Sequence, residues 1–472
     1  MGKAKELDKD LVDVAKQAED NHVRIMPKWC YFDDETDTKK ASAFSLGVTI
    51  LEAEQYLYIQ SGKDIDLFQY SQEAGYWKLI TKQNIKLIIA VMLKDEAVWT
   101  AKVQSDTEKY IFSSIQIKQA KDTIDNVKPH LIHFKNGTYN MENDQLEPNK
   151  SDNYFFAGRD YELDMTNKET EHTDQWLTES VGDAKKFIME YVGYAFYRSY
   201  RPFQKFAVLQ ADGGDGKSTY FNWFNEVIGA NNVSNVSLQE LTDPKKEFTL
   251  AELVRMNANY YADISSGIIT DPSLIKTVTG DDNISTKAKY KDGVSTRLYA
   301  KLFFGANNLP AFKDSSRGFG RRPCIVAFHN IPDFSKRFKL EDIYKEIPAF
   351  TYKCLLAFKS AMDNEKLSET AQMKLDLNNW LIANNHVQEF VEEYGIIGAD
   401  YFVKKVYAYD SYKNFCFENG YKAMSNQKLT VELKRLNIFD TRSRFDGVQA
   451  RIYTGFKLKP SEVQTKLHVV DN

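Results

Sequence analysis

The order of apolar and polar positions predicts short strands and amphipathic helices along most of the chain. In the first third, residues 56–60 and 76–80 look like strands, whereas residues 83–93 repeat apolar side chains with helical spacing. Aromatic residues are frequent throughout this part. We therefore expect residues 1–165 to form a domain that mixes helices and strands.

The middle third contains apolar runs that predict a buried sheet. An amphipathic helix over residues 175–197 leads into the first run, and helical spacing resumes at residues 220–228. The runs that we interpret as buried strands are 206–209, 256–263 and 302–306. Because strands and helices alternate here, we expect an α/β core within residues 170–370.

The last segment, residues 385–472, is predicted to be a separate unit. Ser425 is a good N-cap for a helix that continues to Leu436, and two β-prone stretches then flank Asp446-Gly447. A helix followed by a hairpin is the pattern of a winged helix-turn-helix. A winged helix can bind DNA or serve only protein contacts, and the pattern alone leaves both open.

Composition and charge narrow the classes of protein to which this chain can belong. Of the 472 residues, 43% are hydrophobic and 27% are charged, which is ordinary for a globular protein. The formal net charge is −4, so any nucleic-acid surface must be local. The longest apolar run, residues 87–93, is far too short to span a membrane, and we expect no membrane partner.

Cysteine usage and the N-terminus indicate a cytoplasmic protein. The cysteines are widely separated and form no Cys-x-x-Cys pair, so neither structural zinc nor a disulfide framework is expected. The first residues lack the apolar core of a signal peptide. A reducing cytoplasm is therefore the expected compartment.

A Gly-rich turn between the 206–209 strand and the 220–228 helix predicts a phosphate-binding loop. Glycines let backbone N–H groups curl around phosphates, and the helix N-terminus adds its dipole. Lys217 would reach the β- and γ-phosphates of ATP, and the Ser218 hydroxyl would hold Mg²⁺. Ala211 stands where the usual motif has its first glycine, and a Gly-rich surface turn is the alternative. The residues expected to bind ATP are Gly213, Gly214, Asp215, Gly216, Lys217, Ser218 and Thr219.

Polar residues at the ends of the next two strands are candidates for catalysis. Asp263 could hold the water shell of Mg²⁺ and orient the attacking water, and Asn307 could hydrogen-bond the γ-phosphate. The second strand offers a single acid, so the identity of the catalytic base stays open. Arg321 and Arg322 supply cations that could neutralise transition-state charge. If such an arginine comes from a neighbouring subunit, hydrolysis requires an oligomer.

The segment between Lys276 and Lys301 predicts a basic hairpin. It holds six basic residues against three Asp, and Asp292-Gly293 favours a type I′ turn between two β-prone arms. Basic side chains that alternate along one arm lie on one face, which suits contact with the backbone of single-stranded DNA. The candidates are Lys287, Lys289, Tyr290, Lys291 and Arg297. A solvated hairpin is the alternative.

The tail is basic as well. From Tyr421 onward, ten Lys and Arg residues oppose five Asp and Glu residues. A recognition helix in the major groove of duplex DNA, with the wing on phosphates, would explain this charge. The candidates for contact with DNA are Lys428, Arg435, Arg442 and Arg444.

Taken in order, these parts resemble the superfamily 3 helicases, specifically the phage, plasmid and poxvirus primase-helicase family. The resemblance covers roughly residues 130–330 and implies an AAA+ fold for the ATPase core. It implies that Asn307 is the sensor asparagine and that Arg321 or Arg322 acts in trans. The overall layout is similar to replication initiator helicases of staphylococcal pathogenicity islands and related phages.

The function implied by this resemblance is an ATP-driven DNA helicase that initiates replication. It implies a homo-hexameric ring, with single-stranded DNA in the pore and an origin duplex on the C-terminal domain. Host replication proteins would be further partners. Three alternatives stay open: a primase that uses the acidic cluster 33–37 to bind metal, an ATP-regulated DNA-binding protein without motor activity, and a metabolic P-loop kinase.

Overall fold

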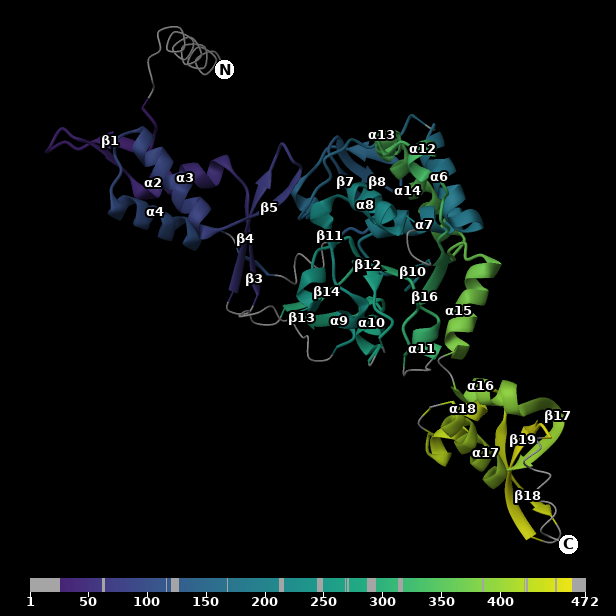
Figure 1. Cartoon of the computed structure of the whole chain (residues 1–472). Helices are drawn as coiled ribbons and strands as arrows, with labels where there is room; N and C mark the ends of the chain where they lie inside the picture. Colours follow the sequence, from purple (N-terminus) through teal and green to yellow (C-terminus); the bar gives the residue numbers. More distant parts are fainter. Residues whose placement is uncertain are drawn as a thin grey trace. The chain divides into compact units, whose positions relative to one another are not determined.

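The computed structural model of the protein (Figure 1) forms two compact units, which are described separately below. One unit contains the chain up to Leu163 together with Asn283–Arg297, and the other contains Asp164–Asp282 and the chain from Leu298 onward. No helix within the described residues is both long and apolar enough to cross a membrane. The structure describes residues 26–460 except 62–63, 116, 120–126, 168, 212–215, 244–248, 268, 270, 287–293, 313–316, 384–385, 420, 422 and 446–447.

The first unit mixes helices and strands, as its sequence pattern predicts. Its largest sheet has the order β5-β4-β3-β6, in which only the β3–β6 pair is parallel. A second sheet, β7-β8-β9, contains the hairpin that turns at residues 135–136. The elements are β1 (Cys30–Phe32), β2 (Lys39–Ala41), α2 (Ala43–Ala53), β3 (Tyr56–Ser61), β4 (Asp64–Ser71), β5 (Tyr76–Ile80), α3 (Lys82–Asp95), α4 (Ala101–Ser114), β6 (Ile117–Gln119), β7 (Leu131–Phe134), β8 (Gly137–Asn140), β9 (Gln145–Glu147), η1 (Ser151–Asn153), β13 (Asn283–Thr286) and β14 (Val294–Arg297).

The second unit is built on a five-stranded sheet with the order β11-β12-β15-β10-β16, drawn in teal and green in Figure 1. All four neighbouring pairs are parallel, so the carboxyl ends of the strands share one edge. Because β15 separates β10 from β12, the residues after β15 lie between those after the other two strands. Its strands are β10 (Phe206–Gln210), β11 (Val233–Ser234), β12 (Ala258–Ile264), β15 (Lys301–Ala306) and β16 (Pro323–Ala327).

Helices of this unit surround the sheet. The amphipathic pattern of residues 175–197 predicts one helix, but the structure has two, because the chain reverses at Gly182 with a φ of +51°. The helical elements are α6 (Glu171–Val181), η2 (Gly182–Ala184), α7 (Lys185–Phe196), α8 (Lys217–Ile228), η3 (Ala230–Asn232), α9 (Leu238–Leu241), η4 (Thr249–Leu253), α10 (Ser273–Val278), α11 (Arg317–Gly320), α12 (Phe334–Arg337), α13 (Leu340–Lys345), α14 (Ile347–Asp363) and α15 (Ala371–Ala383).

Aromatic side chains fill the space between α8 and the sheet. The rings of Tyr220 and Phe221 both lie 5.5 Å from that of Phe303 on β15, measured between centroids. On its other side, α8 contacts α6 through Trp223 and Trp176, whose ring centroids are 5.5 Å apart. Such aromatic pairs add to the apolar area that they bury. This packing fixes the start of α8 relative to the strand ends.

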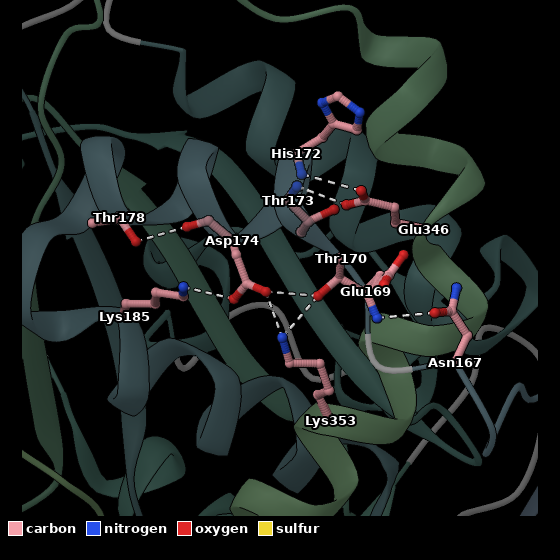
Figure 2. Close-up of polar contacts among 10 residues, drawn as sticks. All are labelled: Asn167, Glu169, Thr170, His172, Thr173, Asp174, Thr178, Lys185, Glu346 and Lys353. Carbon is pink, nitrogen blue, oxygen red and sulfur yellow. Dashed lines mark hydrogen bonds and ion pairs between the residues drawn. The ribbon is translucent and has the colours of Figure 1, made fainter.

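Polar contacts join α6, α7 and α14, as Figure 2 shows. The Glu346 carboxylate accepts hydrogen bonds from the first turn of α6, including the Thr173 N–H at 2.7 Å, and so provides partners that a helix N-terminus lacks. Asp174 forms ion pairs with Lys185 on α7, at 2.6 Å, and with Lys353 on α14. The three helices are therefore fastened together beside the sheet.

The last part of the second unit has its own apolar core. Its three strands form an antiparallel sheet of order β17-β19-β18, and side chains from α16, α17 and α18 pack on it. The predicted N-cap is confirmed, because the Ser425 hydroxyl accepts the Lys428 N–H at 3.4 Å. The elements are α16 (His386–Tyr394), β17 (Gly395–Lys404), α17 (Lys405–Glu418), α18 (Asn426–Arg435), β18 (Phe439–Phe445) and β19 (Val448–Leu458).

Candidate nucleotide-binding site

The phosphate loop ends where α8 begins. Gly216 has a φ of +91°, a conformation that favours glycine, and α8 starts at the next residue, Lys217. The Lys217 side chain is buried, and its Nζ donates to the Ala211 carbonyl at 3.1 Å and to Asn307 Oδ1 at 2.8 Å. The ammonium group is therefore held at the carboxyl edge of β10 and β15. Gly213, Gly214 and Asp215 lie outside the described residues.

The start of α8 suits phosphate and Mg²⁺. A cradle for phosphate needs backbone without bulky neighbours, and the nearest atom to a Cβ built on Gly216 is Phe328 Cε1 at 3.8 Å. Ser218 is exposed and Thr219 is half-buried in the first turn of the helix. No group of three His, Cys, Asp or Glu among the described residues could hold a metal alone. The residues predicted to hold Mg²⁺ together with phosphate oxygens are Ser218 and Asp263.

Asp263 lies on a β-bulge. Two residues of β12, Ala262 and Asp263, face one residue of β15, Gly305. A Cβ on Gly305 would lie 2.1 Å from the Ala262 carbonyl oxygen, so the close approach of the two backbones requires glycine. Asp263 is exposed on this strand, whereas the sequence pattern predicts burial throughout. Bulges of this kind re-aim side chains, and here the result is a carboxylate presented to solvent.

Strand order brings the three predicted catalytic positions to neighbouring strand ends. Lys217 follows β10, Asn307 follows β15, and Asp263 is near the end of β12. The hydrogen bond between Lys217 and Asn307 shows that the first two are in contact. An ammonium group, an amide and a carboxylate along one sheet edge are the groups that phosphoryl transfer to water uses.

The two predicted arginines have different environments. Arg321 is exposed, and its Nη2 donates to Gln204 Oε1 at 2.8 Å. Arg322 is 7% exposed, and its Nε donates to Thr279 Oγ1 at 2.8 Å. Burial, and then the charge of Arg321, lower the pKa of Arg322. Only Arg321 is presented to solvent.

The predicted DNA-contacting residues are described in part. Lys287, Lys289, Tyr290 and Lys291 lie outside the described residues, but the two arms of their hairpin are β13 and β14. Arg297 is exposed at the end of β14. Of the residues predicted to contact DNA in the C-terminal part, Lys428, Arg442 and Arg444 are exposed. Arg435 ends α18, and its side chain lies outside the described set.

The acidic cluster at residues 33–37 forms the turn between β1 and β2. The Asp33 carboxylate accepts the Lys40 ammonium at 2.5 Å and the Thr36 N–H at 3.0 Å. These contacts, with that of Lys40 the strongest, hold the pKa of Asp33 well below its usual range. The Asp33 carboxylate therefore stabilises the turn between β1 and β2.

Three residues near the site were not assigned from sequence. Gly305 forms the bulge, and a lone glycine inside a strand pattern is a signal that could have found it. Thr279 is fully buried beside Arg322, and Trp380 of α15 donates its indole N–H to the Pro310 carbonyl at 2.8 Å. Neither contact has a local sequence signal, because each joins segments that are far apart along the chain.

Comparisons with known proteins agree with this description. A family of unknown function (DUF5906) matches residues 209–322, which contain the nucleotide site, and a family described as poxvirus D5 protein-like matches residues 382–456. The D5-like match supports the resemblance to superfamily 3 helicases. The A-form apo structure of the NrS-1 C-terminal region has a TM-score of 0.50 at 11% identity, over 88% of this chain and 98% of that one. This likeness shows a shared fold.

Two further solved structures have lower TM-scores. Another apo structure of the NrS-1 C-terminal region has a TM-score of 0.49 at 11% identity, over 88% of this chain and 99% of that one. A JCV helicase with a bound small molecule has a TM-score of 0.24 at 12% identity, over 46% and 68%. Neither score is high enough to bear on the fold.

Proposed function

We propose that this chain is an ATP-driven DNA helicase that initiates replication. The observation that carries the proposal is the contact of Lys217 with Asn307, beside the strand whose bulge presents Asp263. The parallel five-stranded sheet supports a P-loop ATPase core, because ligands of such sheets bind outside the carboxyl ends of the strands.

The residues at the carboxyl edge of the sheet have separate roles in ATP hydrolysis. ATP with Mg²⁺ supplies the phosphoryl group and a neutralising cation. Lys217 holds the β- and γ-phosphates, and the Ser218 hydroxyl takes a position on the metal. Asp263 orients the attacking water or the metal's water shell, while Asn307 donates its amide to the γ-phosphate. When nucleotide binds, the Lys217 ammonium would exchange Asn307 for phosphate oxygens as its hydrogen-bond acceptor. This exchange would signal that nucleotide is bound.

The motor is a homo-hexameric ring in this proposal. Exposed Arg321 supplies the cation that reaches a neighbouring subunit's nucleotide, which makes hydrolysis depend on assembly. The basic tip between β13 and β14 contacts single-stranded DNA in the pore through its phosphates. Phosphate contacts carry no sequence information, as a translocating motor requires.

The C-terminal domain, residues 385–472, binds origin duplex in this proposal. Its order is helix, strand, two helices and two strands, with a three-stranded antiparallel sheet, which is the order of a winged helix. Exposed Lys428 and Lys434 on α18, with Arg442 and Arg444 on β18, support DNA contact. An N-terminal accessory domain spans residues 1–165 and the ATPase domain spans 170–370 in this proposal. This layout is that of replication initiators of staphylococcal pathogenicity islands. Host replication proteins would be further partners of the assembly.

ATP turnover tests the proposal. Wild-type protein should hydrolyse ATP in the presence of Mg²⁺ and respond to single-stranded DNA with faster turnover. Lys217→Ala should reduce turnover at least about 100-fold, since the phosphates lose a fixed ammonium. Lys336→Ala, which removes an exposed cation on α12, is the matched control and should leave turnover unchanged. DNA binding without any turnover would instead favour a regulator that uses ATP only as a ligand.

A further inference from the structure

We propose that Arg322 is a positioning residue that acts inside its own subunit, where it holds the junction between α10 and the 283–297 hairpin. This inference rests on the proposed helicase function, and it assigns Arg322 a role different from that of a trans-acting arginine. The segment concerned, residues 279–282, is called the hairpin junction below.

The guanidinium of Arg322 is used within the subunit. Its Nε donates to Thr279 Oγ1 at 2.8 Å, its Nη2 to the Lys276 carbonyl at 3.3 Å, and its Nη1 to the Gly318 carbonyl. The last carbonyls of α10 lack partners within the helix, so a cation placed there satisfies them. The guanidinium therefore donates in three directions, two of them to the end of α10 and one to α11.

Thr279 is oriented to receive this contact. Its side chain is fully buried, and its hydroxyl donates to the Ile275 carbonyl at 2.6 Å. A hydroxyl that donates in one direction keeps lone pairs for an acceptor role, which the Arg322 Nε–H uses. A chain of two hydrogen bonds thus links Arg322 to the body of α10.

Withdrawing Arg322 would remove a hydrogen-bond partner from three polar groups. The side chain is 7% exposed, and burial already lowers its pKa. To reach a neighbouring nucleotide, the guanidinium would have to leave the Thr279 hydroxyl and two carbonyls without these partners, which is unfavourable for buried groups. Arg321 has no such restriction, because it is exposed and its Nη2 contacts only the side chain of Gln204 among the contacts described for it.

The backbone of Arg322 ties the same junction to the sheet. Its carbonyl accepts the N–H of Phe206, the first residue of β10, at 2.9 Å, and β16 starts at the residue after Arg322. One residue therefore joins the central strand, through its main chain, to α10, through its side chain. The hairpin junction, residues 279–282, is therefore linked to the sheet of its own unit.

The hairpin junction is held from a second side. The Gly280 carbonyl accepts a hydrogen bond from Gln204 Nε2 at 3.3 Å, and a Cβ on Gly280 would lie 2.9 Å from the Lys276 carbonyl oxygen. The Asp281 carboxylate accepts the Ser199 hydroxyl at 3.0 Å and pairs with Arg201 Nε at 3.1 Å. The junction is thus held at consecutive residues within its own unit, and Arg322 supplies the contact nearest to α10.

Mixed assemblies distinguish the two roles of the arginines. Arg321→Ala and Arg322→Ala are each mixed in equal amounts with Lys217→Ala, and DNA-stimulated ATP turnover is measured. If an arginine acts in trans, such a mixture recovers about a quarter of the wild-type turnover. Half of the subunits can then hydrolyse ATP, and half of their neighbours supply the arginine. We expect restoration with Arg321→Ala and none with Arg322→Ala. Restoration with Arg322→Ala would overturn the proposal.

Thr279 variants test the contact without altering an arginine. Thr279→Ser keeps the hydroxyl, whereas Thr279→Val keeps the shape and removes it. We expect Thr279→Val to lower the ratio of DNA-stimulated to basal turnover at least about tenfold, in line with the loss of a hydrogen bond to a charged group, and Thr279→Ser to leave the ratio near wild type. An equal ratio in both variants would contradict the proposal. Absence of turnover in wild-type protein would instead contradict the helicase function itself.

Discussion

Lys217 Nζ lies 2.8 Å from Asn307 Oδ1, although the two residues are 90 positions apart in the sequence. The contact joins the loop after β10 to the end of β15. Since these strands are neighbours in the sheet, their ends must be close, and the amide oxygen orients the ammonium group toward the same edge. This pairing is the geometric basis of the proposed active site.

Removing the side-chain amide of Asn307 should slow ATP hydrolysis. Asn307→Ala deprives Lys217 of its partner and the γ-phosphate of a donor, so we expect ATP turnover to fall about 100-fold. Asn308→Ala, in the exposed neighbouring residue, should stay within about twofold of wild type. Steady-state turnover with Mg²⁺ is the measurement, and equal rates for the two variants would remove Asn307 from the mechanism.

The bulge at Asp263 depends on Gly305. In Gly305→Ala the added Cβ meets the Ala262 carbonyl at 2.1 Å, so the two strands must separate. We expect the free energy of unfolding to fall by about 1–3 kcal/mol, as in other overpacked sites, and turnover to fall with it because Asp263 is displaced. Gly267→Ala is the control, since its Cβ meets only Ser265 Oγ at 3.3 Å. Equal free energies of unfolding for the two variants, measured by chemical denaturation, would contradict the dependence of the bulge on Gly305.

Contact of α18 with DNA should appear as a change in salt dependence. Lys434 is exposed on this helix, and its loss should reduce the slope of log binding constant against log salt by about one, as for one phosphate contact. Lys413→Ala removes an exposed cation from α17 and should not change the slope. Titrations of duplex DNA at several salt concentrations compare the two, and identical slopes would argue for a winged helix that contacts proteins.

Acid should destabilise the C-terminal part through His386. Its Nε2 lies 2.7 Å from the Tyr412 hydroxyl, its ring stacks on Tyr421, and burial lowers its pKa. Because the folded pKa is below the unfolded value of about 6.5, the unfolded chain binds the proton first as the pH falls. The stability contributed by neutral His386 is thus present above about pH 6.5 and is lost on acidification.

His386→Phe isolates this effect. The variant keeps a ring for stacking and cannot titrate, so its melting temperature should depend less on pH between about pH 8 and about pH 5.5 than that of wild type. Melting curves at both values give the comparison. An equal decrease in the two proteins would show that other groups control the acid response.

Local patterns predicted the elements of this protein well. The strands after which Lys217 and Asn307 stand are both apolar runs, and the Ser425 cap has a local hydrogen-bond signal. The order of strands has no local signal, because it arises from pairing between distant segments. The same holds for the buried Arg322, whose Thr279 partner lies 43 positions away.

Where prediction failed, backbone conformation was decisive. The helix expected over 175–197 breaks at Gly182, since a residue with positive φ ends α6. The strand expected to be buried presents Asp263 to solvent, since the bulge opposite Gly305 changes its alternation. Periodicity alone assumes a regular backbone, and both departures occur at or beside glycine.

Strand displacement on a forked DNA duplex tests the central claim most directly. Wild-type protein and Lys217→Ala are compared with ATP and Mg²⁺, after both have been shown to bind the fork equally. The account predicts that wild type releases the displaced strand and that Lys217→Ala does not, because the motor needs the phosphate contact. Tight binding of the fork by wild-type protein, with no displacement, would contradict a helicase.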